Sequence, residues 1–132
     1  MILKLIGSFA GATFVVSASL AMAHHSFAMF DNEHPIELRG ALQEFKFTSP
    51  HTIVFLTVMN LDGTTTTWNL EGENSGTLIR AGWTRQSIKP GDELIMTIMP
   101  LRSGAPAGSW DVKKITFSNG QPIVTLNPNQ AK

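Results

Sequence analysis

Residues 36–47 read Ile-Glu-Leu-Arg-Gly-Ala-Leu-Gln-Glu-Phe-Lys-Phe, a long strand-like stretch with a glycine in its interior. Glycine is unfavourable in a regular strand, and at such a position it usually marks a bulge or a sharp bend. We therefore expect one long first strand that bends near Gly40.

Further strand-like segments follow, separated by turns rich in glycine, proline and asparagine. The Asp62-Gly63 pair is a hairpin signal. Asn74 or Ser75 suits the start of a short helix that runs to about Ala81, and Gly82 suits the left-handed residue just past its end. The expected strands after the first are residues 53–59, 64–70, 93–99 and 110–117, with a short edge strand at 122–126.

The order strand, strand, strand, short helix, strand, strand is that of the OB-fold, a five-stranded Greek-key barrel. We predict an all-β fold with one short helix, arranged as a small OB-like barrel; the alternative is a β-sandwich to which the helix is an addition. The predicted barrel domain covers residues 36–127, after an N-terminal arm at 24–35 and before a tail at 128–132.

Residues 1–23 have the features of a secretory signal peptide. Lys4 supplies a positive charge, residues 5–16 are mostly apolar, and Ala21-Met22-Ala23 is a small-x-small cleavage sequence. A membrane-spanning helix needs about 20 predominantly apolar residues, which is longer than this stretch. We expect cleavage after Ala23, with cleavage after Ala21 as the alternative, and a periplasmic product that does not insert into the membrane.

The composition argues against several classes of function. The chain has 10 Lys+Arg and 10 Asp+Glu, so it lacks the positive charge of a nucleic-acid or polybasic membrane binder. It contains no cysteine, which excludes disulfides, thiolate nucleophiles and metal sites built on thiolates.

The favoured candidate ligands of copper are His24, His25 and His51. After cleavage at Ala23, the free amine and the imidazole of His24 can chelate one metal ion, and His25, His34 or His51 can add a further nitrogen. Nitrogen ligands favour Cu(II), which binds most tightly among the divalent first-row metals. Cleavage after Ala21 instead makes His24 the third residue, which also forms a Cu(II) chelate.

Two loops form a second candidate site. In an OB-fold the loops between strands one and two and between strands four and five lie on the ligand-binding face. Here these loops are residues 48–51 and 101–109, so His51 and Arg102 are expected to face one pocket. Trp110 follows the second loop as a further candidate contact for a periplasmic protein or a small envelope ligand.

Other patterns are better explained as structure. Met96 and Met99 are three residues apart and so point to opposite faces of a strand. This predicts that one packs in the core and the other covers it, rather than a copper-binding pair. Glu71-Gly72-Glu73 leaves a strand beside a turn, which predicts a solvated turn rather than the acid pair of a glycosidase. The chain has no nucleophile triad in a supporting context, no phosphate-binding loop and no dinucleotide fingerprint.

Six short segments occur in a fixed order: His24-His25-Ser26-Phe27, Ser49-Pro50-His51, Trp68-Asn69-Leu70-Glu71, Arg80-Ala81-Gly82-Trp83, Lys89-Pro90-Gly91-Asp92 and Pro100-Leu101-Arg102-x-Gly104. With these segments the chain resembles a family of small exported bacterial proteins catalogued as a domain of unknown function. The family usually has asparagine where this chain has Ser49. The resemblance implies a bacterial, periplasmic protein and brings no established activity.

The sequence thus predicts a periplasmic OB-like module that binds Cu(II) through His24, with His25 or His51 as a further ligand and Arg102 as a neighbouring contact. The alternative is an interaction module without metal, which binds its ligand between loops 48–51 and 101–109. A copper oxidase that uses His24 is the least favoured function, because the short chain offers no evident substrate cleft.

Overall fold

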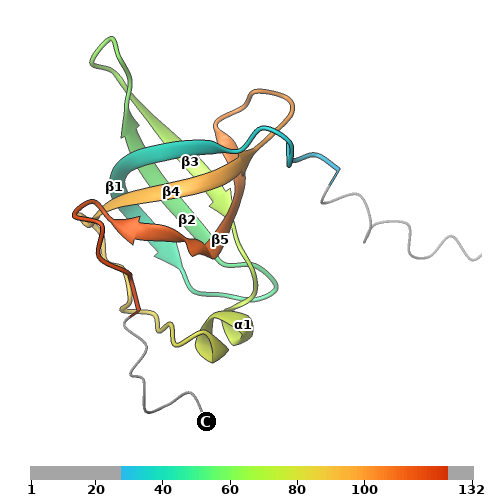
Figure 1. Ribbon diagram of the computed structural model, residues 1–132, viewed down its shortest axis with the longest axis vertical. Helices are drawn as coiled ribbons and strands as arrows, with labels where there is room; N and C mark the ends of the chain where they lie inside the picture. Colours follow the sequence, from blue (N-terminus) through green and yellow to red (C-terminus); the bar gives the residue numbers. More distant parts are fainter. Residues whose placement is uncertain (1–27, 125–132) are drawn as a thin grey trace, which may run out of the picture.

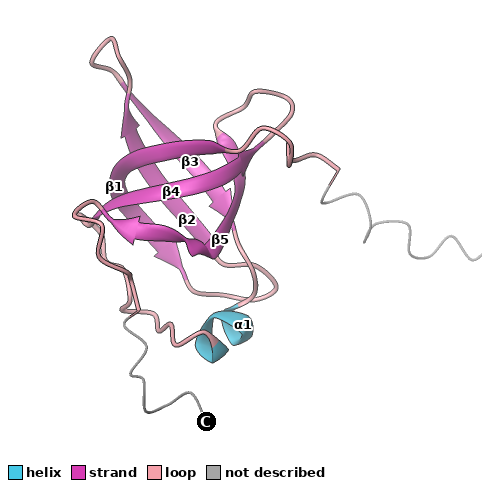
Figure 2. Cartoon of the chain, in the orientation of Figure 1, coloured by secondary structure: helices cyan, strands magenta, loops and turns pink. Residues whose placement is uncertain are grey.

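The computed structural model describes residues 28–124, which form five strands and one short helix (Figure 1). The strands are β1 (Ile36–Lys46), β2 (Ile53–Met59), β3 (Thr65–Glu71), β4 (Glu93–Pro100) and β5 (Ala107–Phe117), and helix α1 (Ser75–Arg80) lies between β3 and β4. The strands close into a barrel in the order β1-β2-β3-β5-β4 (Figure 2). The predicted OB-like all-β fold is confirmed, and the sandwich alternative is wrong.

Strand β1 is shared between two neighbours, as its length and its glycine suggest. Residues 36–41 pair with β4 and residues 41–46 pair with β2, so Ala41 has a partner on both sides. A Cβ atom on Gly40 would lie 2.3 Å from the carbonyl oxygen of Thr57. Only glycine therefore fits where the strands converge, and the bulge itself follows between Leu42 and Glu44.

The barrel closes through a short parallel pairing of β3 with β5. Only Asn69–Glu71 and Ala107–Ser109 take part in it, whereas the antiparallel pairings are longer. The β2–β3 hairpin therefore projects beyond the barrel at one end, while α1 lies at the other (Figure 1). The pairing ends at Glu71 and Ser109, and the candidate site lies just beyond these two residues.

The core fills the barrel with side chains from every strand. Leu78 of α1 and Trp83 just after it are also buried in this core. The side chain of Asn74 accepts a hydrogen bond from the Thr77 amide at 2.9 Å, so Asn74 rather than Ser75 caps the helix. Gly82 has the expected positive φ of 86°. The core residues are Leu38, Leu42, Phe47, Val54, Leu56, Leu70, Leu78, Trp83, Ile88, Leu94, Met96, Ile98, Trp110 and Ile115.

The structure differs from the expected strands in two places. Strand β5 begins at Ala107, three residues before the expected start, because residues 107–109 pair with β3 in spite of their low β-propensity. The edge strand expected at 122–126 is not found in residues 122–124, where Pro122 forms only an isolated bridge with Thr116.

The predicted signal peptide, His24, His25 and the tail at 128–132 lie outside the described residues. Within residues 28–124, no helix has the length and apolar character that crossing a membrane requires.

Candidate functional site

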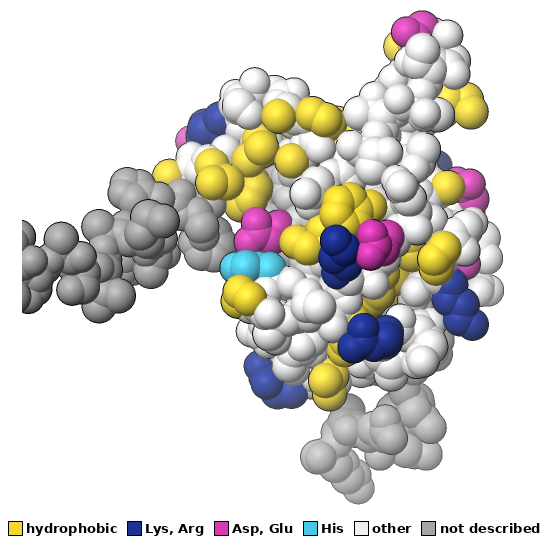
Figure 3. All heavy atoms as spheres, turned by 180° about the vertical axis from the view of Figure 1, so that it is seen from behind, with side chains coloured by type: hydrophobic (Ala, Val, Ile, Leu, Met, Phe, Trp, Pro, Cys, Tyr) yellow, Lys and Arg dark blue, Asp and Glu magenta, His cyan; other side chains and the backbone are white. Residues whose placement is uncertain are grey.

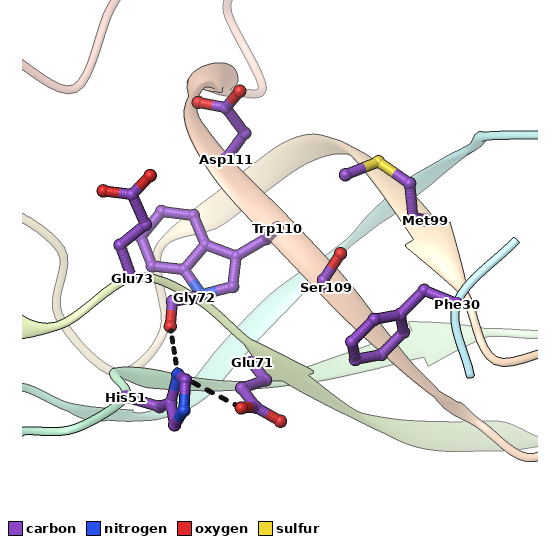
Figure 4. Close-up of a pocket in the computed structure, with 9 residues that line it drawn as sticks. All are labelled: Phe30, His51, Glu71, Gly72, Glu73, Met99, Ser109, Trp110 and Asp111. Atoms are coloured by element: carbon purple, nitrogen blue, oxygen red, sulfur yellow. Dashed lines mark hydrogen bonds and ion pairs between the residues drawn. The ribbon is translucent and has the colours of Figure 1, made fainter. Parts of the chain in front are cut away.

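A pocket of about 220 Å³ opens where β3 and β5 separate (Figure 4). This volume is below the roughly 300–1,000 Å³ of sites for drug-sized ligands, so the pocket suits an ion or a small molecule. Its wall comes from the arm, the β1–β2 loop and strands β3, β4 and β5. The lining residues are Phe30, His51, Glu71, Gly72, Glu73, Met99, Ser109, Trp110 and Asp111.

His51 is held from one side of its ring. Its Nδ1 atom lies 3.2 Å from the carbonyl oxygen of Gly72 and 3.1 Å from Oε1 of Glu71 (Figure 4). A carbonyl oxygen can only accept a hydrogen bond, which assigns the proton to Nδ1. Nε2 has no hydrogen-bond partner among residues 28–124, and the side chain is 46% exposed. The lone pair of Nε2 is therefore available to a metal ion or a ligand.

The β1–β2 loop that carries His51 is fixed by its neighbours. The Thr48 hydroxyl donates to the His51 carbonyl oxygen at 2.9 Å, and the Thr48 carbonyl oxygen accepts from the Ser75 amide at 3.1 Å. The loop is thus tied to the first turn of α1. These contacts position His51 without using its imidazole.

Backbone pairing continues past the end of β3 and fixes Gly72. The Gly72 amide donates to the Thr52 carbonyl oxygen at 2.8 Å, and the Thr52 amide and hydroxyl both donate to the Glu73 carbonyl oxygen. A Cβ atom on Gly72 would lie 2.4 Å from Nε1 of Trp110. Glycine is therefore required here, where the chain crosses the indole.

Trp110 forms a wall that is continuous with the core. Its side chain is only 4% exposed, and its ring centroid lies 5.5 Å from that of Trp83 and 6.3 Å from that of Phe45. Its Nε1 atom is buried without a hydrogen-bond partner in the described part of the chain. The sequence placed Trp110 as a candidate ligand contact, and the structure shows a packed residue with one side on the pocket.

Three carboxylates line the pocket: Glu71, Glu73 and Asp111. On this side of the molecule acidic side chains lie beside a histidine and a hydrophobic cluster (Figure 3). The expectation of a solvated turn at Glu71-Gly72-Glu73 is incomplete, because both glutamates border the cavity and Glu71 contacts His51. The pocket therefore combines apolar walls with negative charge.

Arg102 does not line this pocket. Its guanidinium lies 3.7 Å from Oδ1 of Asp31, and its amide donates to the Met29 carbonyl oxygen at 2.9 Å. The expectation that His51 and Arg102 face one pocket is wrong, because Arg102 contacts the arm instead.

The described part of the arm lies against the β4–β5 loop. Phe30 forms an isolated antiparallel bridge with Leu101, is 6% exposed, and lines the pocket. The Asp31 amide donates to the Pro100 carbonyl oxygen at 2.8 Å. The hydrogen bond from His34 to Asp31, at 3.0 Å, holds the pKa of the Asp31 carboxyl below its ordinary value, and the nearby amide of Glu33 acts in the same direction.

Within residues 28–124, no three side chains of the metal-ligating types come together as a metal site. A metal ion at His51 therefore needs ligands from elsewhere. His25 precedes Phe30 by five residues and His24 by six. An extended chain spans at most about 3.5 Å per residue, so a tether of six residues can span no more than roughly 21 Å.

Several lining residues were not foreseen as site residues. Phe30 lies in the expected arm and is not among the candidate site residues of the sequence, whereas Met99, expected as cover, lies partly buried on the pocket wall. Ser109 and Asp111 reach the pocket because β5 pairs with β3 in parallel. Such a pairing between distant segments leaves no local signal in the sequence.

Residues 12–119 match the sequence model of a family described as Family of unknown function (DUF6152). The match covers well over half of the chain, and it agrees with the resemblance drawn from the short segments. A search of curated proteins gave no match.

Proposed function

The chain belongs to the Family of unknown function (DUF6152), and from the site itself we propose that it is an exported, periplasmic module that binds Cu(II). One observation carries the proposal. Phe30 of the arm lines the same pocket as His51, so the candidate ligands His24 and His25 are tethered five to six residues from that pocket.

The proposed ligand set consists of nitrogen atoms. After cleavage at Ala23, His24 offers its amine and imidazole, and His25 or Nε2 of His51 completes the set. Such a set favours Cu(II). The short tether makes binding of the second group intramolecular, with an effective concentration in the millimolar range. Two weak partial sites thereby become one tight site.

The charge of the pocket supports a cation. Glu71, Glu73 and Asp111 border the cavity, which contains no lysine or arginine among its lining residues. Each carboxylate at about 4 Å from a unit positive charge contributes an attraction of about 1 kcal/mol in water, and more where water is partly excluded. A divalent ion would therefore be attracted to this end of the barrel.

The test is a titration of Cu(II) into the exported protein against a competing chelator, after intact mass has established its N-terminus. We expect one tight equivalent, strong weakening in His51→Ala, and the same weakening when a methionine precedes His24. His34→Ala is the matched control, because His34 is bound to Asp31. Two outcomes contradict a site shared by His24 and His51. One is an affinity for Cu(II) no greater than that of a His-His-Ser-Phe peptide, and the other is an unchanged affinity in His51→Ala.

A second candidate function is binding of a small organic cation without metal. Phe30, Met99 and Trp110 give the pocket apolar walls beside its three carboxylates. An aromatic ammonium ion such as phenethylammonium matches both features, since its ring can stack and its charge can pair. We expect it to quench tryptophan fluorescence in metal-free protein and to bind Asp111→Asn more weakly. Equal affinity for phenethyl alcohol, its uncharged analogue, would exclude this function.

A further inference from the structure

We infer that Glu71 is a positioning residue for His51: together with the Gly72 carbonyl group, it holds the imidazole as the Nδ1–H tautomer and presents Nε2 to a metal ion. The identity of the metal rests on the proposed function. The arrangement of His51 is independent of the proposed function, because it concerns the metal-free protein.

Register places Glu71 next to His51. Glu71 pairs with Ile53 across the β2–β3 ladder, and His51 precedes Ile53 by two residues. Residues two apart in an extended chain point to the same face, and diagonal neighbours across a ladder are within reach of long side chains. The 3.1 Å distance between Nδ1 and Oε1 follows from this register.

The second acceptor is a backbone group whose direction is fixed. Gly72 is buried, its amide is paired with Thr52, and its α-carbon lies against the Trp110 indole. Its carbonyl oxygen accepts from Nδ1 at 3.2 Å. Two consecutive residues thus place an oxygen near the same nitrogen: Gly72 accepts the hydrogen bond, and Glu71 contributes a charged contact that also favours a proton on Nδ1.

This arrangement is the one that tunes metal-binding histidines in general. A carboxylate that accepts from one ring nitrogen fixes the orientation of the ring and raises the basicity of the other nitrogen, and its loss typically weakens metal binding about 10–100-fold. In this chain the hydrogen bond from Nδ1 goes to the Gly72 carbonyl oxygen, and Glu71 adds a carboxylate oxygen 3.1 Å from the same nitrogen.

Glu73 provides a matched comparison. It is the same residue type, lies two positions further along, and borders the same pocket, but within residues 28–124 its carboxylate forms no hydrogen bond or ion pair with His51. Glu71→Gln and Glu73→Gln therefore remove the same charge from the same cavity. Only Glu71→Gln removes the charge that lies 3.1 Å from Nδ1, and it preserves the shape of the side chain.

The experiment has two readouts. Nitrogen-15 NMR of the metal-free exported protein, at a pH where His51 is neutral, reports which ring nitrogen carries the proton. Competition titration with Cu(II) then compares the two glutamine variants with the wild type. We expect the proton on Nδ1, about tenfold weaker Cu(II) binding in Glu71→Gln, and less than threefold weakening in Glu73→Gln.

The outcomes separate the two proposals. A proton on Nε2 in the wild type, or equal weakening by both variants, overturns the inference, because general pocket charge would then explain the loss. If the protein binds no Cu(II) tightly, a fall in the Nδ1–H population in Glu71→Gln but not in Glu73→Gln supports the positioning of His51 by Glu71 and overturns the copper function, whereas an unchanged population in Glu71→Gln overturns the inference. Native-like backbone spectra in both variants establish that neither change unfolds the barrel.

Discussion

Phe30 and Leu101 pair through a single antiparallel bridge, which joins the arm to the loop between β4 and β5. Hydrogen bonds on both sides of the bridge reinforce it, from the Asp31 amide to Pro100 and from the Arg102 amide to Met29. The bridge fixes the position of Phe30, the residue from which the preceding part of the arm extends. It thereby places Phe30 on the wall of the pocket that His51 also lines.

Phe30→Ala is expected to destabilise the protein and to weaken Cu(II) binding. The ring is 6% exposed, and truncation of a buried phenylalanine costs about 3–5 kcal/mol, with the low end expected at this edge of the core. Urea unfolding measures the first effect and competition titration of the folded variant the second. Met29→Ala is the control, because Met29 is 48% exposed and should change neither quantity. Unchanged Cu(II) affinity in folded Phe30→Ala would show that the arm need not be anchored here.

Trp110→Ala is expected to lower the free energy of unfolding by about 3–5 kcal/mol, because it leaves a cavity between Phe45, Trp83 and Gly72. The variant therefore reports on the fold more than on a ligand. Trp110→Phe retains an aromatic ring, and we expect it to cost less in the same urea titration while leaving the barrel intact. A loss below 1 kcal/mol in Trp110→Ala would contradict the packed position of the indole.

The fold could be predicted from the sequence because turns, caps and strand breaks leave local signals in it. The Asp62-Gly63 turn, the Asn74 cap and Gly82 each act within a few residues, and Gly40 interrupts the strand pattern locally although its close neighbour Thr57 lies on another strand. The edge strand expected from residue 122 shows the limit: residues 122–124 form only an isolated bridge, since a few apolar residues do not establish that they pair with a neighbouring strand.

The candidate site was only partly predictable. His51 was recognised because it follows a turn on the expected binding face, and it does line the pocket. For Glu71 the local sequence predicts only a solvated turn, because its contact with His51 depends on the register of β3 with β2. Arg102 was placed in the pocket, because no local pattern shows that Asp31, 71 residues earlier in the chain, lies beside it.

Asp31→Asn is expected to change how stability depends on pH in acid. The hydrogen bond from His34 is the main cause that lowers the Asp31 pKa below its ordinary value of 3.8. A carboxyl group with a lowered folded-state pKa stabilises the protein fully above its unfolded-state pKa, and this contribution disappears as the pH falls through the folded-state value. Wild type should therefore lose more stability than Asp31→Asn as the pH falls below about 4.

Urea midpoints between pH 2 and pH 7 measure the Asp31 effect. His34→Gln serves as the companion variant, because it removes the principal partner of the same carboxylate. It should flatten the acid side of the profile in the same direction, and the double variant should add little. Parallel profiles for wild type and Asp31→Asn would show that the contact has no energetic role in solution.

Arg102→Ala is expected to have little effect on stability and none on Cu(II) affinity. Its guanidinium is 53% exposed and lies 3.7 Å from Asp31, and exposed ion pairs of this kind contribute about 0–1 kcal/mol. The bond from its amide to Met29 remains in the variant, so the arm should keep its position. Competition titrations of Arg102→Ala and His51→Ala with Cu(II) show which of the two side chains lies near the ion. If Arg102→Ala weakened Cu(II) binding as strongly as His51→Ala, the ion would lie nearer the β4–β5 loop than the pocket around His51 allows.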